Sequence, residues 1–148
     1  DGKVARLQAA DLRMAYRHSE LPPDAVCLRA AFSMVAGEQD EIRATMERMK
    51  TEKNASQPLR GRTGGSTFKN PRQDGLPQHA WQLIDAVGLR GHRIGGAHFS
   101  DKHCNFMMND AGASAADLEH LGELARQKVQ EKFGIDMEWE IKKVGEPA

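Results

Sequence analysis

The stretch 114-SAADLEHLGELARQKVQEKFGIDMEWEIKKV-144 carries two hydrophobic periodicities in direct succession. Ser114 and Asp117 have the spacing of a capping box, and Gly134 stands where a helix would end, so this part predicts an amphipathic helix. From Met137 to Val144 apolar and charged residues alternate, which predicts a half-buried strand. A helix followed directly by a strand favours an α+β fold. The apolar positions of the helix are Leu118, Leu121, Leu124, Ala125 and Val129.

Two more elements are predicted in the N-terminal part of the chain. In 26-VCLRAAFSMV-35 apolar side chains occupy alternate positions, which indicates a strand with one buried face. From Glu38 to about Lys53 the apolar spacing changes to that of an amphipathic helix, which we expect to cover a sheet. The apolar stripe of that helix consists of Ile42, Met46 and Met49.

The middle of the chain is rich in turn residues and then becomes regular. Residues 54–79 contain much of the Gly, Pro, Asn, Ser and Gln and predict an extended loop. Residues 80–89 predict a helix that Gly88 ends, with Trp81, Ile84 and Val87 on its buried face. Residues 92–110 predict two strands around a turn. Together the elements predict an α+β domain with a small sheet and helices on one face.

Composition limits the classes of function. The 148 residues hold 21 Lys and Arg against 21 Asp and Glu, so no overall field directs the chain to nucleic acid or an anionic membrane. No apolar run approaches the roughly 20 residues of a membrane span. Cys27 and Cys104 are far apart in apolar runs, which predicts buried thiols in a reducing compartment, and therefore a cytoplasmic protein.

The segment 61-GRTGGSTFKNPR-72 is built to hold Ser66 in one place. Gly64 and Gly65 permit a positive φ or a close approach of another molecule, and Pro71 stops a helix or a central strand from continuing. The G-x-S-x-G elbow of acyl transfer and the phosphate-binding G-x-x-x-x-G-K-[ST] loop are both absent. From these residues alone, an ordinary turn stays open as an alternative.

Other candidate sites have weaker patterns. The six histidines show no metal-binding spacing, and neither cysteine has a CxxC partner, so no metal is expected. A basic stretch with one aromatic residue could contact RNA, although the chain is neutral. Glu140 is by default a solvent-facing residue of a half-buried strand. The basic stretch consists of Arg60, Arg62, Lys69 and Arg72, with Phe68 among them.

Four segments occur together in the order found in one enzyme family. They are 16-YRHS-19, 65-GSTFKNP-71, 88-GLRGHRIGGAHFSDKHCNFMMN-109 and 134-GIDMEWEIKKVG-145. With them the chain resembles the UDP-N-acetylenolpyruvoylglucosamine reductase (UDP-N-acetylmuramate dehydrogenase) family of bacterial peptidoglycan synthesis. The resemblance implies an oxidoreductase that uses FAD and NADPH to convert UDP-N-acetylglucosamine enolpyruvate to UDP-N-acetylmuramate, in support of cell wall biogenesis, cell shape and cell division.

The resemblance also implies roles for single residues. Ser66 matches the family's proton donor, and Arg17 and Glu140 match the residues that act on the enolpyruvyl carboxylate. Glu138 is the alternative if the strand is one face out of register. One departure is Ser56, because related sequences often have a basic residue directly before the Gln-Pro element. The implied substrate-binding residues are Asn70, Lys69, Gln57 and Arg90, and the implied flavin-binding residues are Tyr16, Arg17, Ser19, Gly64 and Gly65.

The resemblance covers the C-terminal half of the enzyme. It implies that residues 1–36 are the end of an FAD-binding domain and that residues 37–148 form a substrate-binding domain. The N-terminal FAD-binding half would then be the partner without which this chain is inactive. A second hypothesis stays open, namely a module that binds a UDP-sugar, or less readily RNA, without catalysis.

Overall fold

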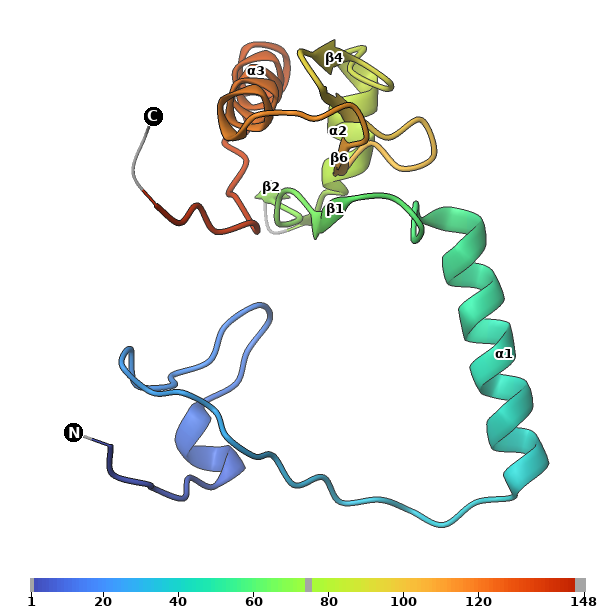
Figure 1. Cartoon of the computed structure of the whole chain (residues 1–148), viewed down its shortest axis with the longest axis vertical. Helices are drawn as coiled ribbons and strands as arrows, with labels where there is room; N and C mark the ends of the chain where they lie inside the picture. The colour runs from blue at the N-terminus through green and yellow to red at the C-terminus, as the bar shows by residue number, and fades with distance from the viewer. Residues whose placement is uncertain (1, 74–75, 146–148) are drawn as a thin grey trace. The chain divides into compact units, whose positions relative to one another are not determined.

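The structure is a computed structural model that describes residues 2–73 and 76–145 in two units, which divide after Gly37 (Figure 1). The first unit contains one short 3-10 helix, η1 (Ala9–Leu12), and a tight turn in which Ala15 and His18 pair. Apart from the half-buried Leu12, its described side chains are exposed. This unit has no core of its own.

The predicted strand 26–35 is wrong for this chain. The segment has no regular structure, and the side chains of Val26, Phe32 and Val35 are 80%, 83% and 95% exposed. A strand forms where a neighbour takes up its backbone hydrogen bonds, and no described residue pairs with this segment. For the same reason Cys27 is exposed, contrary to the expectation of a buried thiol, whereas Cys104 is buried as predicted.

Helix α1 (Gln39–Ser56) opens the second unit and confirms the predicted helix. Its apolar stripe covers no sheet, however, because Ile42, Met46 and Met49 are 48%, 65% and 59% exposed. The periodicity defines an apolar face but not its partner. None of the described helices, including the long α1, has the length and apolar character needed to cross a membrane.

Two small antiparallel sheets follow α1, so the predicted loop 54–79 contains more regular structure than expected. The larger sheet has four strands in the order β1-β6-β5-β4, which places the first strand of the unit beside the last (Figure 1). The predicted two strands at 92–110 are three. The strands are β1 (Thr63–Ser66), β2 (Arg72–Gln73), β3 (Leu76–Pro77), β4 (Arg93–Ile94), β5 (Ala97–Phe99) and β6 (Phe106–Asn109), of which β2 and β3 pair only with each other.

Two helices complete the core. Helix α3 (Ala115–Phe133) contacts β4, β5 and α2 (Ala80–Ala86). The predicted capping box is present, because Asp117 N–H donates to Ser114 Oγ at 3.1 Å and Ser114 N–H donates to the Asp117 carboxylate at 3.0 Å. In α2 the buried residues are Ala80, Leu83 and Ile84, and Val87 after the helix is partly buried, so the prediction holds for Ile84 and Val87 but is wrong for the exposed Trp81. The α+β architecture is as predicted.

The predicted strand 137–144 is reduced to a single bridge between Phe68 and Trp139. The predicted alternation of burial holds only from Met137, which is buried, to Trp139, which is partly buried, with Glu138 exposed between them; Glu140 and Ile141 are both partly buried. The ladder ends because Glu140 N–H and Ile141 N–H both donate to Thr67 O, at 2.9 and 3.4 Å. Two successive amides directed at one carbonyl break the alternation that a strand requires.

Trp139 joins this C-terminal segment to helix α3. Its ring lies against Gly122 so closely that a Cβ at position 122 would overlap it. Its Nε1 donates to Glu123 Oε1 at 3.1 Å, and its ring centroid lies 4.8 Å from that of Phe68. The absence of a side chain at Gly122 therefore sets how closely the segment before Glu140 approaches the helix.

We predict that Gly122→Ala destabilises the protein by about 1–3 kcal/mol, because the new methyl group overpacks a rigid ring. At an ordinary helical position the same change would stabilise by up to about 1 kcal/mol, so the sign of the effect is diagnostic. Urea unfolding of the chain measures it. In a Trp139→Phe background the loss should shrink, and a stabilising Gly122→Ala would contradict the contact.

Candidate active site

Ser66 is the last residue of β1, an edge strand of the larger sheet. The β1–β6 register shifts between Thr63, which pairs with Met108, and Ser66, which pairs with Phe106. The two glycines occupy this irregularity, and Gly65 has φ +91°, a conformation that disfavours other residues. A Cβ at Gly64 would lie 3.2 Å from Ile141 Cδ1. The glycines thus allow both the bulge and the close approach of the C-terminal segment.

The residues after Ser66 are held by Asn105, which precedes β6. Thr67 N–H donates to Asn105 O at 2.7 Å. The Asn105 side chain then pairs with Phe68: Oδ1 accepts from Phe68 N–H at 3.0 Å and Nδ2 donates to Phe68 O at 2.8 Å. Asn105 is not among the residues predicted from the sequence. Its signal was a polar residue between Cys104 and Phe106 in an apolar run, since a buried amide must find partners.

Glu140 reaches the Ser66 segment from the other side. Glu140 N–H donates to Thr67 O, and Lys69 N–H donates to Glu138 O, both at 2.9 Å. These two bonds hold the C-terminal segment beside residues 67–69. The Glu138 carboxylate pairs with Lys69 Nζ and is 71% exposed, whereas Glu140 is partly buried. The structure therefore brings four of the candidate residues together: Ser66, Lys69, Glu138 and Glu140.

Asn70 and Arg90 are engaged in contacts within the fold. Asn70 Oδ1 accepts from the N–H of Ala80, the first residue of α2, at 3.0 Å. Arg90 forms a two-point ion pair with Asp85, at 2.9 and 2.8 Å, and donates to Asp101 O. Hydrogen bonds from Arg90 hold the pKa of Asp85 below its ordinary value. A role of either residue in substrate binding stays a prediction.

Near Arg90, burial raises the pKa of the Cys104 thiol to about 11. This thiol therefore stays protonated at neutral pH, and only a thiolate is an effective nucleophile. Cys104 is a core residue and not a catalytic candidate.

The remaining predicted residues lie in other parts of the chain. Gln57 follows α1, and its N–H donates to Lys53 O at 2.9 Å. Tyr16, Arg17 and Ser19 belong to the first unit, where Arg17 has φ +55° and its guanidinium lies 5.9 Å from the Tyr16 ring centroid. Since Ser66 belongs to the second unit, a site that joins the two groups stays a prediction from the resemblance.

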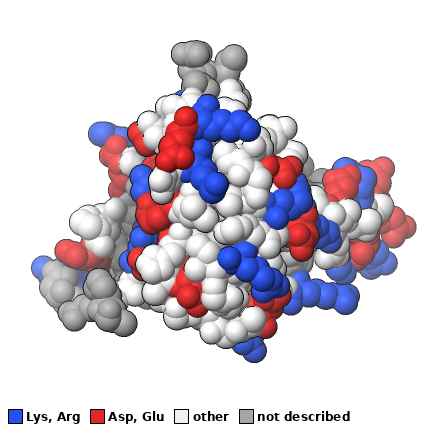
Figure 2. Space-filling view, turned by 90° about the horizontal axis from the view of Figure 1, so that it is seen from above, with Lys and Arg blue, Asp and Glu red and all other residues white. Residues whose placement is uncertain are grey.

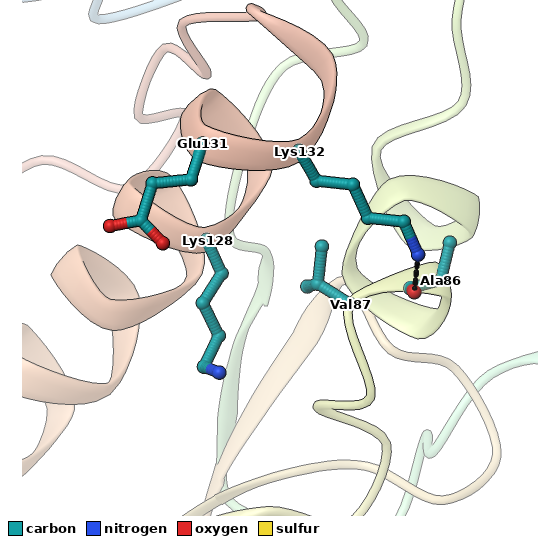
Figure 3. Close-up of a pocket in the computed structure, with 5 residues that line it drawn as sticks. All are labelled: Ala86, Val87, Lys128, Glu131 and Lys132. Atoms are coloured by element: carbon teal, nitrogen blue, oxygen red, sulfur yellow. Dashed lines mark hydrogen bonds between the residues drawn. The ribbon is translucent and has the colours of Figure 1, made fainter.

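A pocket of about 390 Å³ lies between the end of α2 and α3. Figure 3 shows Lys132 reaching across it to donate to Ala86 O, at 2.7 Å, so the lysine satisfies a carbonyl at the end of α2. None of the predicted site residues lines this pocket, whose other residues are Val87, Lys128 and Glu131. Among the described residues no cluster of three or more His, Cys, Asp or Glu is arranged to hold a metal ion.

Surface charge does not favour a polyanion. On the face shown in Figure 2, basic and acidic side chains are interspersed. Many of the basic residues are paired with acids, such as Lys143 with Glu119 and Arg126 with Glu123. On this face the described residues form no continuous basic surface of the kind that RNA-binding proteins use.

Comparisons with known proteins agree on one family. The family model described as "UDP-N-acetylenolpyruvoylglucosamine reductase, C-terminal domain" matches residues 57–144. The reductase of Paracoccus denitrificans is 48% identical over 99% of this chain and 51% of its own length, and that of Granulibacter bethesdensis is 50% identical over 99% and 46%. The crystal structure of the Thermus caldophilus reductase superposes with a TM-score of 0.72 at 35% identity, over 88% of this chain and 46% of that one. The chain thus spans about half the length of these relatives.

The contact between Asn70 and α2 generates a prediction on stability. Asn70→Ala should lower the free energy of unfolding by about 1 kcal/mol, because it leaves an N–H of the first helical turn without its acceptor. Asn70→Asp keeps an acceptor oxygen and should lose much less. Urea unfolding followed by tryptophan fluorescence compares the two, and equal losses would show that the bond to Ala80 is not what Asn70 contributes.

Proposed function

The chain belongs to the UDP-N-acetylenolpyruvoylglucosamine reductase family, and from this membership we propose that it is the C-terminal, substrate-binding part of such a reductase. The complete enzyme would use NADPH to reduce UDP-N-acetylglucosamine enolpyruvate to UDP-N-acetylmuramate, in the bacterial cytoplasm, for peptidoglycan synthesis. Residues 37–148 would form the substrate domain, and residues 1–36 would complete an FAD-binding domain supplied by the N-terminal half of the enzyme. The division of the chain after Gly37 supports this assignment.

The observation that carries the proposal is the backbone pairing of the Ser66 segment with the Glu140 segment. Ser66, the proposed proton donor, and Glu140, the proposed carboxyl group, belong to adjacent, hydrogen-bonded stretches that are far apart in the sequence. Residues that act together on one small group must be held at fixed separations, and backbone bonds do this better than flexible side-chain contacts.

The glycine loop fits a flat cofactor. Apart from its chain neighbours, no described residue has an atom within 4 Å of the position that a Cβ would take at Gly65, so the backbone beside Ser66 is open to the approach of a ring. FAD, when bound, supplies the hydride. Gly64 and Gly65 would border its ring, and Tyr16, Arg17 and Ser19 of the first unit would complete the contact.

The residues of this chain would bind, orient and protonate the substrate. The Ser66 hydroxyl would donate a proton to one carbon of the enolpyruvyl double bond as the other carbon receives hydride. Because a serine hydroxyl is a weak acid, it needs a fixed position and a site that stabilises the developing charge. The planar donors of Arg17 would bind the substrate carboxylate, and Glu140 would act on the same group. Lys69, Asn70, Gln57 and Arg90 are the proposed substrate contacts.

The first test concerns Ser66. In the complete reductase that carries this chain, Ser66→Ala should slow reoxidation of the reduced flavin by the enolpyruvyl substrate at least about 100-fold, because only this half-reaction needs the proton. Reduction of the flavin by NADPH should change by less than about twofold. Stopped-flow absorbance follows both half-reactions separately.

Two outcomes would contradict different parts of the proposal, the first the reductase activity and the second the role of Ser66. A wild-type complete protein that binds the UDP-sugar but never reduces it would favour the non-catalytic binding module. A Ser66→Ala variant that is reoxidised at the wild-type rate would remove Ser66 as the proton donor but leave the reductase assignment intact.

The second test compares two glutamates on the same segment. Glu140→Gln should lower the rate of substrate reduction far more than Glu138→Gln, since Glu138 is the more exposed and pairs with Lys69. Glu138→Gln is the matched control, and neither change removes core volume, so thermal melts should be alike. A dominant loss at Glu138 would mean that the two carboxylates have been assigned in the wrong order.

A further inference from the structure

We propose that Asn105 is a positioning residue that fixes Ser66 relative to Glu140. The residue is 4% exposed, and its side-chain amide holds the backbone of Phe68 by two hydrogen bonds, as donor and as acceptor. The inference builds on the proposed function, because it concerns the geometry in which Ser66 and Glu140 would act.

Asn105 takes the place of a strand neighbour where the sheet stops. The β1–β6 ladder, already shifted by the glycine bulge, ends at the pair of Ser66 and Phe106. Beyond it, Asn105 bonds Thr67 through its main-chain carbonyl and Phe68 through its side chain. One residue thus supplies three hydrogen bonds to the two positions after Ser66.

Thr67 and Phe68 also bind the segment that contains Glu140, on the edge opposite Asn105. Thr67 O accepts from Glu140 N–H, and Phe68 forms the bridge to Trp139. A shift of the Phe68 backbone would therefore move Ser66 along its own strand and Glu140 through the bridged segment. Catalytic groups tolerate little displacement, and about 1 Å can cost on the order of 100-fold in rate.

The two bonds to Phe68 require one donor and one acceptor on the side chain at position 105. An ionised aspartate would direct an oxygen without a hydrogen at Phe68 O, and an alanine would leave both the N–H and the C=O of Phe68 without their partner. A neutral aspartic acid, in contrast, has one donor and one acceptor, as the amide does.

Asn109, the last residue of β6, provides a matched control. Its Oδ1 accepts from Ala113 N–H at 2.7 Å and its Nδ2 donates to Ala113 O at 3.2 Å. The chemistry and two-point geometry are those of Asn105, but Asn109 holds the turn before α3 and not the Ser66 segment. Its replacement removes an equivalent pair of bonds with no direct effect on Ser66.

The first measurement uses the chain itself. Amide hydrogen exchange, followed by NMR, should accelerate at least about tenfold at Lys69 and Glu140 in Asn105→Ala, relative to the change at Val129 in the core of α3. In Asn109→Ala the exchange rates of the Lys69 and Glu140 amides should change by the same factor as that of Val129. Uniform acceleration in Asn105→Ala would mean general destabilisation only and would overturn the inference.

The second measurement uses the complete reductase. Asn105→Ala should lower the rate of flavin reoxidation by the enolpyruvyl substrate about 10–100-fold and change the NADPH half-reaction and the substrate Kd by less than about threefold. Asn109→Ala should leave all three near wild type. Equal effects of the two variants overturn the role of Asn105, whereas a wild-type enzyme without substrate reduction overturns the proposed function.

Asn105→Asp keeps the test decisive if the alanine variant does not fold. Its reoxidation rate, divided by the wild-type rate at each pH, should rise as the pH falls, because the buried carboxyl becomes the neutral acid that can hold Phe68. His103, whose Nδ1 accepts from Asn105 N–H at 3.3 Å, is common to both proteins, so the ratio removes its contribution. A ratio independent of pH, or a fully active variant at high pH, would contradict the inference.

Discussion

The backbone of residues 67–69 is hydrogen-bonded along both edges, and much of the second unit is arranged around it. On one edge lies Asn105 at the start of β6, and on the other lies the segment that carries Glu138 and Glu140. Thr67 and Phe68 are buried between these neighbours and the core. The segment therefore connects the sheet, the C-terminal segment and, through the contact of Phe68 with Trp139, helix α3.

The sequence predicted correctly those elements whose defining hydrogen bonds join residues close together in the chain. The capping box of Ser114 and Asp117 and the terminal Gly134 define α3, because their bonds join residues close in the chain. Segments that need distant partners were predicted less well. The alternation in 26–35 is that of a strand, but no described strand pairs with it. Residues 137–144 form one bridge only, and their burial alternates only from Met137 to Trp139.

The candidate site was also predicted incompletely, because its geometry depends on contacts between residues far apart in the sequence. Ser66, Lys69 and Glu140 were named from the resemblance, and their proximity follows from bonds between residues about 70 positions apart, which no spacing in the sequence discloses. Asn105 was not predicted, because its polar side chain in an apolar run indicates a buried amide but does not identify Phe68 as the partner. Asn70 and Arg90 were named as substrate contacts, and the structure shows that each also has a partner within the fold, Ala80 for Asn70 and Asp85 for Arg90.

The contact between Gly122 and Trp139 links two positions whose substitutions must be compatible. Because a larger residue at 122 would occupy the space of the indole ring, family members that differ at one of these positions are expected to differ at the other. The constraint also applies to hybrid enzymes. A chimaera that joins helix α3 of one reductase to the terminal segment of another should take both residues from the same parent, or its carboxylate at position 140 will be displaced along with the ring.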